Sequence, residues 1–224
     1  MKRPIILLLL LLLLSLAGFL APDARAVNIK DGDWQFWNTN EISLKVADKT
    51  KAVIEEEWRL GEGMGSLYYQ HLQGGLEREV AGWLSVFAGY RDTFSRSKDS
   101  WQHTWMPNGH ANMKLNWKGF DLLGRSRFEY LIPQSTRDYW RYRQRVILKL
   151  PVMVDRWKVR PWTCDEVFVV MTPDDFNENR LSGGIEFKPL SWLTCDLYYM
   201  WKTDKSAAGW VDRNVFGTKA KFSF

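Results

Sequence analysis

The fold of this chain is decided by one stretch, Asp138-Tyr-Trp-Arg-Tyr-Arg-Gln-Arg-Val-Ile-Leu-Lys-Leu150. Its alternate positions form two sets. One is mainly apolar and holds Trp140, Tyr142, Gln144, Val146, Leu148 and Leu150; the other is mainly cationic and holds Arg141, Arg143, Arg145, Ile147 and Lys149. A β-strand sends alternate side chains to opposite faces, so the stretch predicts a strand with an apolar face and a cationic face. A strand of a soluble sandwich turns its polar face to open water and has no need of stacked arginines. A strand of an outer-membrane barrel lies between lipid and an enclosed polar lumen, and this setting fits the stretch.

The first 26 residues have the pattern of a secretory signal peptide. Met1-Lys2-Arg3 is basic, residues 5–21 are apolar, and the segment ends in Ala24-Arg-Ala26. This order predicts cleavage after Ala26 and leaves one domain, residues 27–224. Because the apolar run is long for such a peptide, an uncleaved membrane anchor is the alternative.

The composition of the chain favours a barrel over other classes. Aromatic residues make up 15% of it and include 13 tryptophans, and Trp and Tyr gather at membrane–water interfaces. The same composition excludes disorder. The mean hydropathy is −0.34, and residues 27–224 contain no apolar run long enough for a membrane helix. The net charge is +5, but arginines that alternate along strands should be enclosed, so nucleic acid is not a predicted partner.

Eleven segments alternate in the same way, with short breaks between them. They span residues 32–46, 51–61, 67–78, 82–94, 111–118, 120–132, 138–150, 157–171, 179–188, 192–203 and 213–224. We therefore predict an all-β fold, an antiparallel transmembrane β-barrel of about 10–12 strands of the outer-membrane type. Bacterial single-chain barrels normally have an even number of strands. An odd count means that one strand has been missed or split, or that residues 27–37 thread through the barrel or fold back.

Three longer polar connections are predicted to face the outside, at residues 95–105, 173–178 and 204–212. This arrangement puts the C-terminus in the periplasm. The basic segment Arg91–Lys98, beside the first connection, has two interpretations: an ordinary solvated charge run, or a surface that binds lipopolysaccharide phosphates.

The final strand carries the most specific signal in the sequence. Backwards from the end, Phe224, Phe222, Ala220, Thr218 and Phe216 alternate with small or polar residues. A terminal Phe on such a strand resembles the assembly signal of bacterial outer-membrane barrels. The alternative is a soluble domain that happens to end in an edge strand.

Charged residues on the inward parity of consecutive strands form the main candidate site. They are Arg125, Arg127, Glu129, Arg141, Arg143, Arg145, Glu166 and Arg180. A structural filler would need its acids and guanidinium groups paired, because an unpaired charge in a poorly hydrated interior is costly. A selective pore would need the same cations wet and accessible, and a small strand number favours the filled interior.

Hairpin geometry predicts which of these charges are neighbours. A turn centred near Gln134–Ser135 places Glu129 opposite Arg141, and a turn centred near Met153–Val154 places Arg141 opposite Glu166. Directly opposed residues have Cβ atoms about 4.5–5.5 Å apart, within reach of a guanidinium–carboxylate pair. Arg141 is therefore expected to lie between two acids.

The chain has three histidines, and two of them suggest an alternative function. His103 and His110 flank the predicted external loop near Asp99 and Ser100, and some outer-membrane barrels are hydrolases with such residues at the outer rim. The sequence has no Gly-x-Ser-x-Gly elbow and no His-Glu-x-x-His pair, so no catalytic residue is assigned. The loop has no clear third ligand, so neither a metal nor a cofactor is predicted.

Strand parity places the two cysteines on opposite faces. Cys164 shares the inward face of Glu166, whereas Cys195 shares the lipid face, so we expect two free thiols even in an oxidising compartment. The same parity sends Asp165 toward lipid, where an acid is unfavourable. A β-bulge near this point would turn both acids away from lipid.

Three short motifs resemble a known family. They are Trp140-Arg-x-Arg-x-Arg145, Arg160-Pro161 with Asp165-Glu166-x-Phe168, and Phe176-Asn-x-Asn-Arg-x-x-x-Gly184. They are similar to those of the uncharacterised outer-membrane β-barrels called domain of unknown function 2490. The resemblance extends over most of residues 27–224 and implies an outer-membrane barrel, but it implies no activity.

The sequence thus predicts a barrel in the outer membrane, with membrane lipid, possible lipopolysaccharide contacts and the outer-membrane assembly machinery as its partners. Two functions stay open. The first is a structural barrel or a narrow small-solute channel with an Arg/Glu-filled lumen, and the second is a rim enzyme that hydrolyses lipid or peptide.

Overall fold

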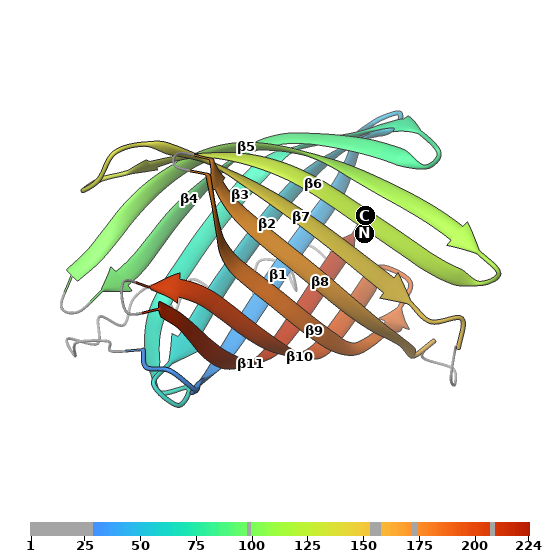
Figure 1. Ribbon diagram of the computed structural model, residues 1–224. Coiled ribbons are helices and arrows are strands. Elements are labelled where there is room, and N and C mark those ends of the chain that lie inside the picture. Colours follow the sequence, from blue (N-terminus) through green and yellow to red (C-terminus); the bar gives the residue numbers. More distant parts are fainter. Residues whose placement is uncertain (1–28, 98–99, 153–157, 172–173, 207–208) are drawn as a thin grey trace, which may run out of the picture.

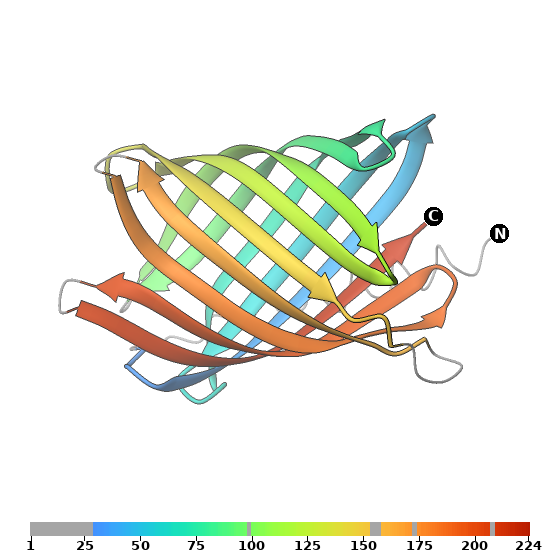
Figure 2. The same ribbon diagram turned by 45° about the vertical axis from the view of Figure 1, so that its right-hand side comes forward.

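Eleven β-strands close into one barrel in the computed structural model (Figures 1 and 2). The structure describes residues 29–97, 100–152, 158–171, 174–206 and 209–224, so the expected signal peptide, residues 1–26, lies outside the described residues. The strands are β1 (Asp33–Ala47), β2 (Thr50–Gly61), β3 (Ser66–Ala81), β4 (Leu84–Ser97), β5 (Ser100–Trp117), β6 (Phe120–Pro133), β7 (Tyr139–Lys149), β8 (Arg160–Met171), β9 (Asp174–Leu190), β10 (Leu193–Ser206) and β11 (Gly209–Ser223). No helix among these residues is long and apolar enough to cross a membrane.

The barrel closes through a parallel pair, although all other neighbours are antiparallel. Consecutive strands form hairpins, so an odd number of them leaves β1 and β11 pointing the same way. They pair in parallel from Asp33 opposite Arg213 to Ser43 opposite Ser223. The count of eleven lies within the predicted range. The expectation of an even number is wrong. The described part of the first segment leads into β1, with Ile29 lining the cavity at the Asp33 end, and residues 27–28 lie outside the described residues.

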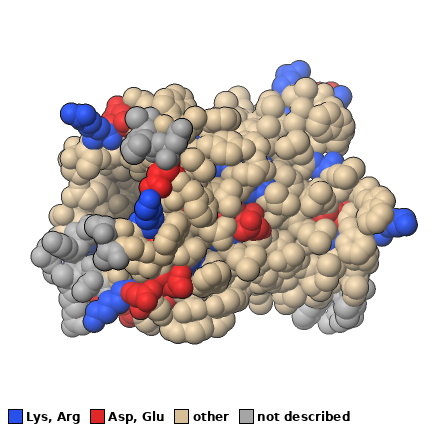
Figure 3. Space-filling view, in the orientation of Figure 1, with Lys and Arg blue, Asp and Glu red and all other residues tan. Residues whose placement is uncertain are grey.

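Alternate residues separate the inside from the outside, as the opening stretch predicts. On β1, the inward residues Gln35, Trp37, Thr39, Glu41 and Ser43 are buried. Their neighbours on the other face include the exposed Trp34 and Leu44. Figure 3 shows an outer surface that is mostly uncharged, with scattered acidic and basic side chains.

The two ends of the barrel differ in the chain segments that they carry. At the Phe224 end, on the right in Figures 1 and 2, β1, β3, β5 and β9 lead into the next strand through two-residue turns. Lys49, Lys118 and Gly119 take positive φ in these turns. The Asp33 end carries the connections of residues 62–65 and 134–138, among others, whereas the longer connection between β7 and β8 also lies at the Phe224 end.

The predicted external loop at residues 95–105 is wrong. β4 continues to Ser97 and β5 begins at Ser100. The other two predicted connections are also largely strand, because β9 begins at Asp174 and β10 runs to Ser206. The reason is that apolar alternation is required only where a strand faces lipid. Beyond that band a strand continues with polar residues on both faces, and the sequence pattern fades before the strand ends.

The outward acid Asp165 is held without a local bulge. Glu166 is inward and buried, and the Nδ2 of Asn179, on β9, donates to Asp165 Oδ1 at 2.9 Å. The irregularity in this strand pair lies between Phe168 and Val169, so the predicted bulge at the two acids is wrong. Cys164 is buried on the inward face, Cys195 is partly exposed, and both are free thiols, as expected.

One part of the interior is packed with apolar side chains. Trp37, Met200 and Val215 form a buried cluster against which Tyr198 packs. The Tyr198 ring lies directly over Gly217, where an added Cβ would come within 1.9 Å of its Cζ. The glycine therefore makes room for an inward aromatic ring.

Candidate functional site in the barrel lumen

The charged residues predicted from strand parity lie inside the barrel, on β6 to β9. Glu129, Arg127 and Glu166 are buried, with Glu129 fully inaccessible. The remaining residues line the internal cavities: Arg125, Arg141, Arg143, Arg145 and Arg180. The structure thus brings the whole set onto one wall of the lumen.

Glu129 is the acid on which this wall converges. Its carboxylate accepts from Arg141 at 2.6 Å and from Arg143 at 2.8 Å, and Arg127 lies 3.5 Å away. Glu129 and Arg141 are direct cross-strand partners, so the predicted register of this hairpin agrees with the structure. A fully buried carboxylate is tolerable here because several guanidinium groups replace its lost hydration.

The predicted contact between Arg141 and Glu166 is wrong. In the β7–β8 pair, Arg141 lies opposite Val170 and Glu166 lies opposite Arg145. The residue that bridges the two acids is Arg143, whose terminal nitrogen lies 3.0 Å from Glu166. The register of two strands depends on where the connection between them is centred. This connection spans residues 150–159, and its centre lies nearer the C-terminus than that of the tight turn at Met153–Val154 on which the prediction was based.

Aromatic rings and arginines alternate across the middle of the lumen. The guanidinium of Arg59 lies between two rings, 3.6 Å from the centre of Trp37 and 3.9 Å from that of Tyr69. Glu57 neutralises Arg59 at 2.5 Å. Trp37 Nε1 is held by Gln35 Oε1 and by the Tyr68 hydroxyl, each at 3.1 Å.

The same layer continues on the opposite wall through Arg180. Its guanidinium carbon lies 4.9 Å from the centre of Trp37 and 4.4 Å from that of Phe168, and Arg143 also lies 4.4 Å from Phe168. Trp37 and Phe168 are only 2% and 1% exposed, which shows that water is excluded around them. We call Trp37, Arg59, Tyr69, Phe168 and Arg180 the septum.

Sequence reasoning missed the aromatic half of the septum, although a signal was present. Trp37 shares the polar parity of Gln35 and Thr39, and Phe168 shares that of Glu166. An aromatic residue on the charged parity of a barrel strand indicates a ring inside the lumen rather than one in lipid.

Cavities lie on both sides of the septum. Toward the Asp33 end, a cavity of about 330 Å³ is lined by Tyr68, Thr93 and Arg141, among others. A middle cavity of about 310 Å³ shares much of its lining with a chamber of about 940 Å³ toward the Phe224 end. The lumen thus holds cavities on both sides of the septum, and Arg59 and Arg180 line both of them.

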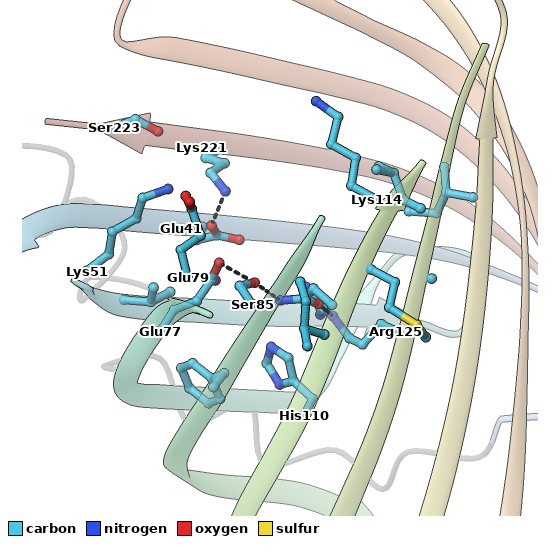
Figure 4. A pocket seen from close by; sticks show the side chains of 18 of the residues that line it. Glu41, Lys51, Glu77, Glu79, Ser85, His110, Lys114, Arg125, Lys221 and Ser223 are labelled. Atoms are coloured by element: carbon cyan, nitrogen blue, oxygen red, sulfur yellow. Dashed lines mark hydrogen bonds and ion pairs between the residues drawn. The ribbon is translucent and has the colours of Figure 1, made fainter. Parts of the chain in front are cut away.

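The larger chamber has walls of both charge signs (Figure 4). Glu41 and Lys221 lie on one wall and form an ion pair at 2.8 Å. His110 and Arg125 lie on another wall, on β5 and β6. Small polar or charged solutes would fit this chamber better than apolar ones.

The two histidines expected at an external loop lie on strand β5 and face opposite ways. His103 Nε2 is hydrogen-bonded to the Asp92 carboxylate, and its ring stacks on Phe94. His110 is buried in the lumen and stacks on Phe87, with the ring centres 4.5 Å apart. The predicted arrangement around one loop is therefore wrong. No cluster of three metal-ligating residues occurs within the described ranges.

The basic segment Arg91–Lys98 is also mainly strand. Arg91 is buried in the lumen, where its Nε donates to Gln73 Oε1 at 3.1 Å, and Arg96 is buried as well. Arg91 thus faces the lumen, whereas Arg96 shares the outward face of its cross-strand partner Trp101, so the lipopolysaccharide interpretation loses one of its cations.

This geometry defines a class: a closed β-barrel with an apolar exterior and a charged lumen that is interrupted by a septum. The chain belongs to the family described as protein of unknown function (DUF2490), whose model matches residues 34–213, so the resemblance in the motifs is confirmed. Among solved structures it is similar to LpxR from Salmonella typhimurium, with a TM-score of 0.48 and 11% sequence identity over 78% of this chain and 83% of that chain. No curated protein matches the chain.

Proposed function

We propose that this protein is an outer-membrane barrel with a closed lumen, which acts as a structural or solute-holding barrel and not as an open pore. The observation that carries the proposal is the septum, where Trp37 and Phe168 are almost inaccessible between stacked arginines. A guanidinium over a desolvated ring contributes about 2 kcal/mol, so several such contacts favour a layer that stays closed.

The exterior supports a membrane-spanning position. Exposed tryptophans gather toward both rims: Trp34, Trp101, Trp105, Trp140, Trp201 and Trp210 toward the Asp33 end, and Trp83 and Trp117 toward the Phe224 end. On β5, Trp105 and Trp117 are twelve residues apart. With a strand tilt of about 45° they lie about 28 Å apart along the barrel axis, close to the thickness of a hydrocarbon core.

The terminal strand supports delivery by the outer-membrane assembly machinery. Phe224 N–H donates to Ser43 O at 2.9 Å, and Lys45 N–H donates to Phe224 O at 3.0 Å. The last residue is therefore joined to β1 through its backbone while its ring stacks on Trp192 outside. Both features fit a residue that the assembly machinery recognises before the barrel closes and that becomes bonded to β1 when the barrel closes.

Two measurements test the proposal. Membrane fractionation should place the folded, heat-modifiable protein in the outer membrane, and planar bilayers containing it should show no large, steady conductance. Recovery in the soluble periplasm or the inner membrane would contradict the location, and a porin-sized conductance would contradict the closed lumen.

The geometry gives the rim-enzyme alternative no support. His103 and His110 are on opposite faces of the barrel wall, and no serine or threonine hydroxyl bonds to either of them among the described residues. A hydrolase would need a nucleophile within hydrogen-bond reach of its base. The narrow-channel alternative requires the septum to open. The conductance measurement in planar bilayers tests this alternative as well.

A further inference from the structure

Two pairs of arginines face each other directly across β6 and β7. Arg125 is the cross-strand partner of Arg145, and Arg127 is the cross-strand partner of Arg143. Like charges in directly opposed positions destabilise a sheet, and inside a barrel little water is available to screen them. This arrangement needs an anion, either from the protein or from a ligand.

The acids nearby are already engaged. Glu129 has three arginines within 3.5 Å, and Glu166 has Arg143 at 3.0 Å and Arg180 at 3.8 Å. Within the part of the chain that the structure describes, Arg125 and Arg145 form no ion pair. Glu166 is the cross-strand neighbour of Arg145, but its carboxylate contacts Arg143 and Arg180 instead, so neither Arg125 nor Arg145 has a carboxylate of the described residues within ion-pair distance.

The opposite wall does not supply the missing charge. Glu41 and Glu55 both contact Lys219, at 2.7 and 3.5 Å. Glu41 also pairs with Lys221, and Glu55 with Arg91. These acids contact their own cations, so they compensate the positive charge on β6 and β7 only at longer range.

Several buried donors on the positive wall lack a partner. The Nε of Arg127, the Nε of Arg145 and the Nδ1 of His110 are buried without a hydrogen bond among the described residues. Arg127 is 3% exposed and His110 is 8% exposed. Asn112 Oδ1 accepts from Arg125 Nε at 2.8 Å, which orients that guanidinium from behind. Unsatisfied buried nitrogens are costly, and a bound oxyanion would offset this cost by meeting the outer nitrogens of the same guanidinium groups from the cavity.

The cluster opens onto space of suitable size. Arg125, Arg127 and Arg145 line both the middle cavity of about 310 Å³ and the chamber of about 940 Å³ toward the Phe224 end. In Figure 4, Arg125 and His110 lie side by side on the wall of that chamber. A solute can thus approach from the Phe224 end without crossing the septum.

We propose that Arg125, Arg127 and Arg145 form a binding site for a phosphate or sulfate group. Planar guanidinium groups match the paired oxygens of such a group. Three guanidinium groups offer more hydrogen-bond donors than a single carboxylate or chloride ion can accept from. His110 adds a further donor when its Nδ1 carries a proton. The site depends on the lumen alone, and it stands whether or not the barrel conducts.

The test uses the folded protein in detergent. Inorganic phosphate should raise the unfolding temperature in a saturable way, beyond sodium chloride at equal ionic strength, because a ligand that binds only the folded state stabilises it. Titration calorimetry should give an affinity at least tenfold weaker for Arg145→Gln and for Arg125→Gln. Lys188→Gln, at the mouth of the same chamber, should bind like the wild type.

Stability without phosphate separates this proposal from a purely structural role. Arg145→Gln removes a like charge opposite Arg125 and an opposite charge facing Glu166, so its stability in phosphate-free buffer should stay close to that of the wild type. A wild type with no phosphate-specific response would overturn the proposal, as would an Arg145→Gln variant with full affinity or one that is destabilised equally with and without phosphate. Replacing inorganic phosphate by phosphatidylglycerol in the micelles distinguishes a free ligand from a lipid headgroup.

Discussion

The guanidinium of Arg59 lies against the face of Trp37, with 3.6 Å between its central carbon and the centre of the ring. Trp37 comes from the first strand and Arg59 from the second, so the contact forms within the first hairpin of the barrel. Arg180 reaches the same ring from β9. The ring in the middle of the lumen is therefore held from two distant parts of the chain.

Trp37→Ala should open the septum. It removes the ring shared by Arg59 and Arg180 and leaves a gap in the driest part of the lumen. We expect a measurable rise in single-channel conductance over the wild type in planar bilayers. Trp34→Ala, on the outer face of the same strand, is the matched control and should not conduct. Equal conductance in all three proteins would show that Trp37 does not close the lumen.

Glu129→Leu should be strongly destabilising. It removes the carboxylate that Arg141 and Arg143 share and leaves buried guanidinium groups uncompensated, which typically costs about 3–5 kcal/mol. The control is Asp175→Asn, because Asp175 forms an exposed pair with Lys205, and such pairs contribute about 0–1 kcal/mol. Denaturant unfolding in detergent measures both. Similar losses of unfolding free energy for the two variants would show that Glu129 is not the main acid of the buried charge network.

A double-mutant cycle should identify the true partner of Glu166. Arg143→Leu and Glu166→Leu should be coupled by about 0.5–3 kcal/mol, since the two side chains are in contact. Arg141→Leu and Glu166→Leu should be much closer to additive, because Arg141 lies opposite Val170. If the larger coupling belonged to Arg141, the hairpin would have the register expected of a tight turn.

Gly217→Ala should lower the unfolding temperature. The added Cβ would overlap the ring of Tyr198, and overpacking of this kind typically costs about 1–3 kcal/mol. Gly74→Ala is the control, since a Cβ at Gly74 meets nothing within 4 Å. The Gly74→Ala variant should be as stable as the wild type. An equal loss of stability in both variants would mean that glycine is needed for its backbone conformation and not to make room for the Tyr198 ring.

Deletion of Phe224 should impair assembly more than export. It removes the two terminal hydrogen bonds to Ser43 and Lys45 and the ring that stacks on Trp192. We expect normal amounts of exported chain but less heat-modifiable protein in the outer membrane. Phe224→Tyr keeps both features and should assemble normally. Equal folded amounts with and without residue 224 would exclude an assembly role.

Much of the fold could be predicted because lipid and lumen impose alternation on every strand. That alternation identified all eleven strands and the inward position of Glu129 and Arg143. Register was harder to predict, since it depends on the length of each connection, and the segment between β7 and β8 carries no turn signal. This is why Arg143, and not Arg141, bridges Glu129 and Glu166.

The septum and the histidines show a second limit of sequence analysis. Trp37 stacks on Arg180, although strands β10 and β11 lie between their own strands in the barrel. A contact across the lumen joins strands that are not neighbours, so the alternation within a single strand cannot predict it. Likewise, the polar segment around His103 looked like a loop because strands that extend past the lipid no longer need an apolar face.

The parallel pairing of β1 with β11 also gives the chain a direction along the barrel axis. In a barrel with an even number of strands, both termini emerge in the same compartment. Here the chain enters the wall at Asp33 and leaves it at Phe224, at opposite rims. In a bilayer, a segment joined before β1 and one joined after β11 would stand on different sides, so the polypeptide itself would be a covalent tether between two compartments.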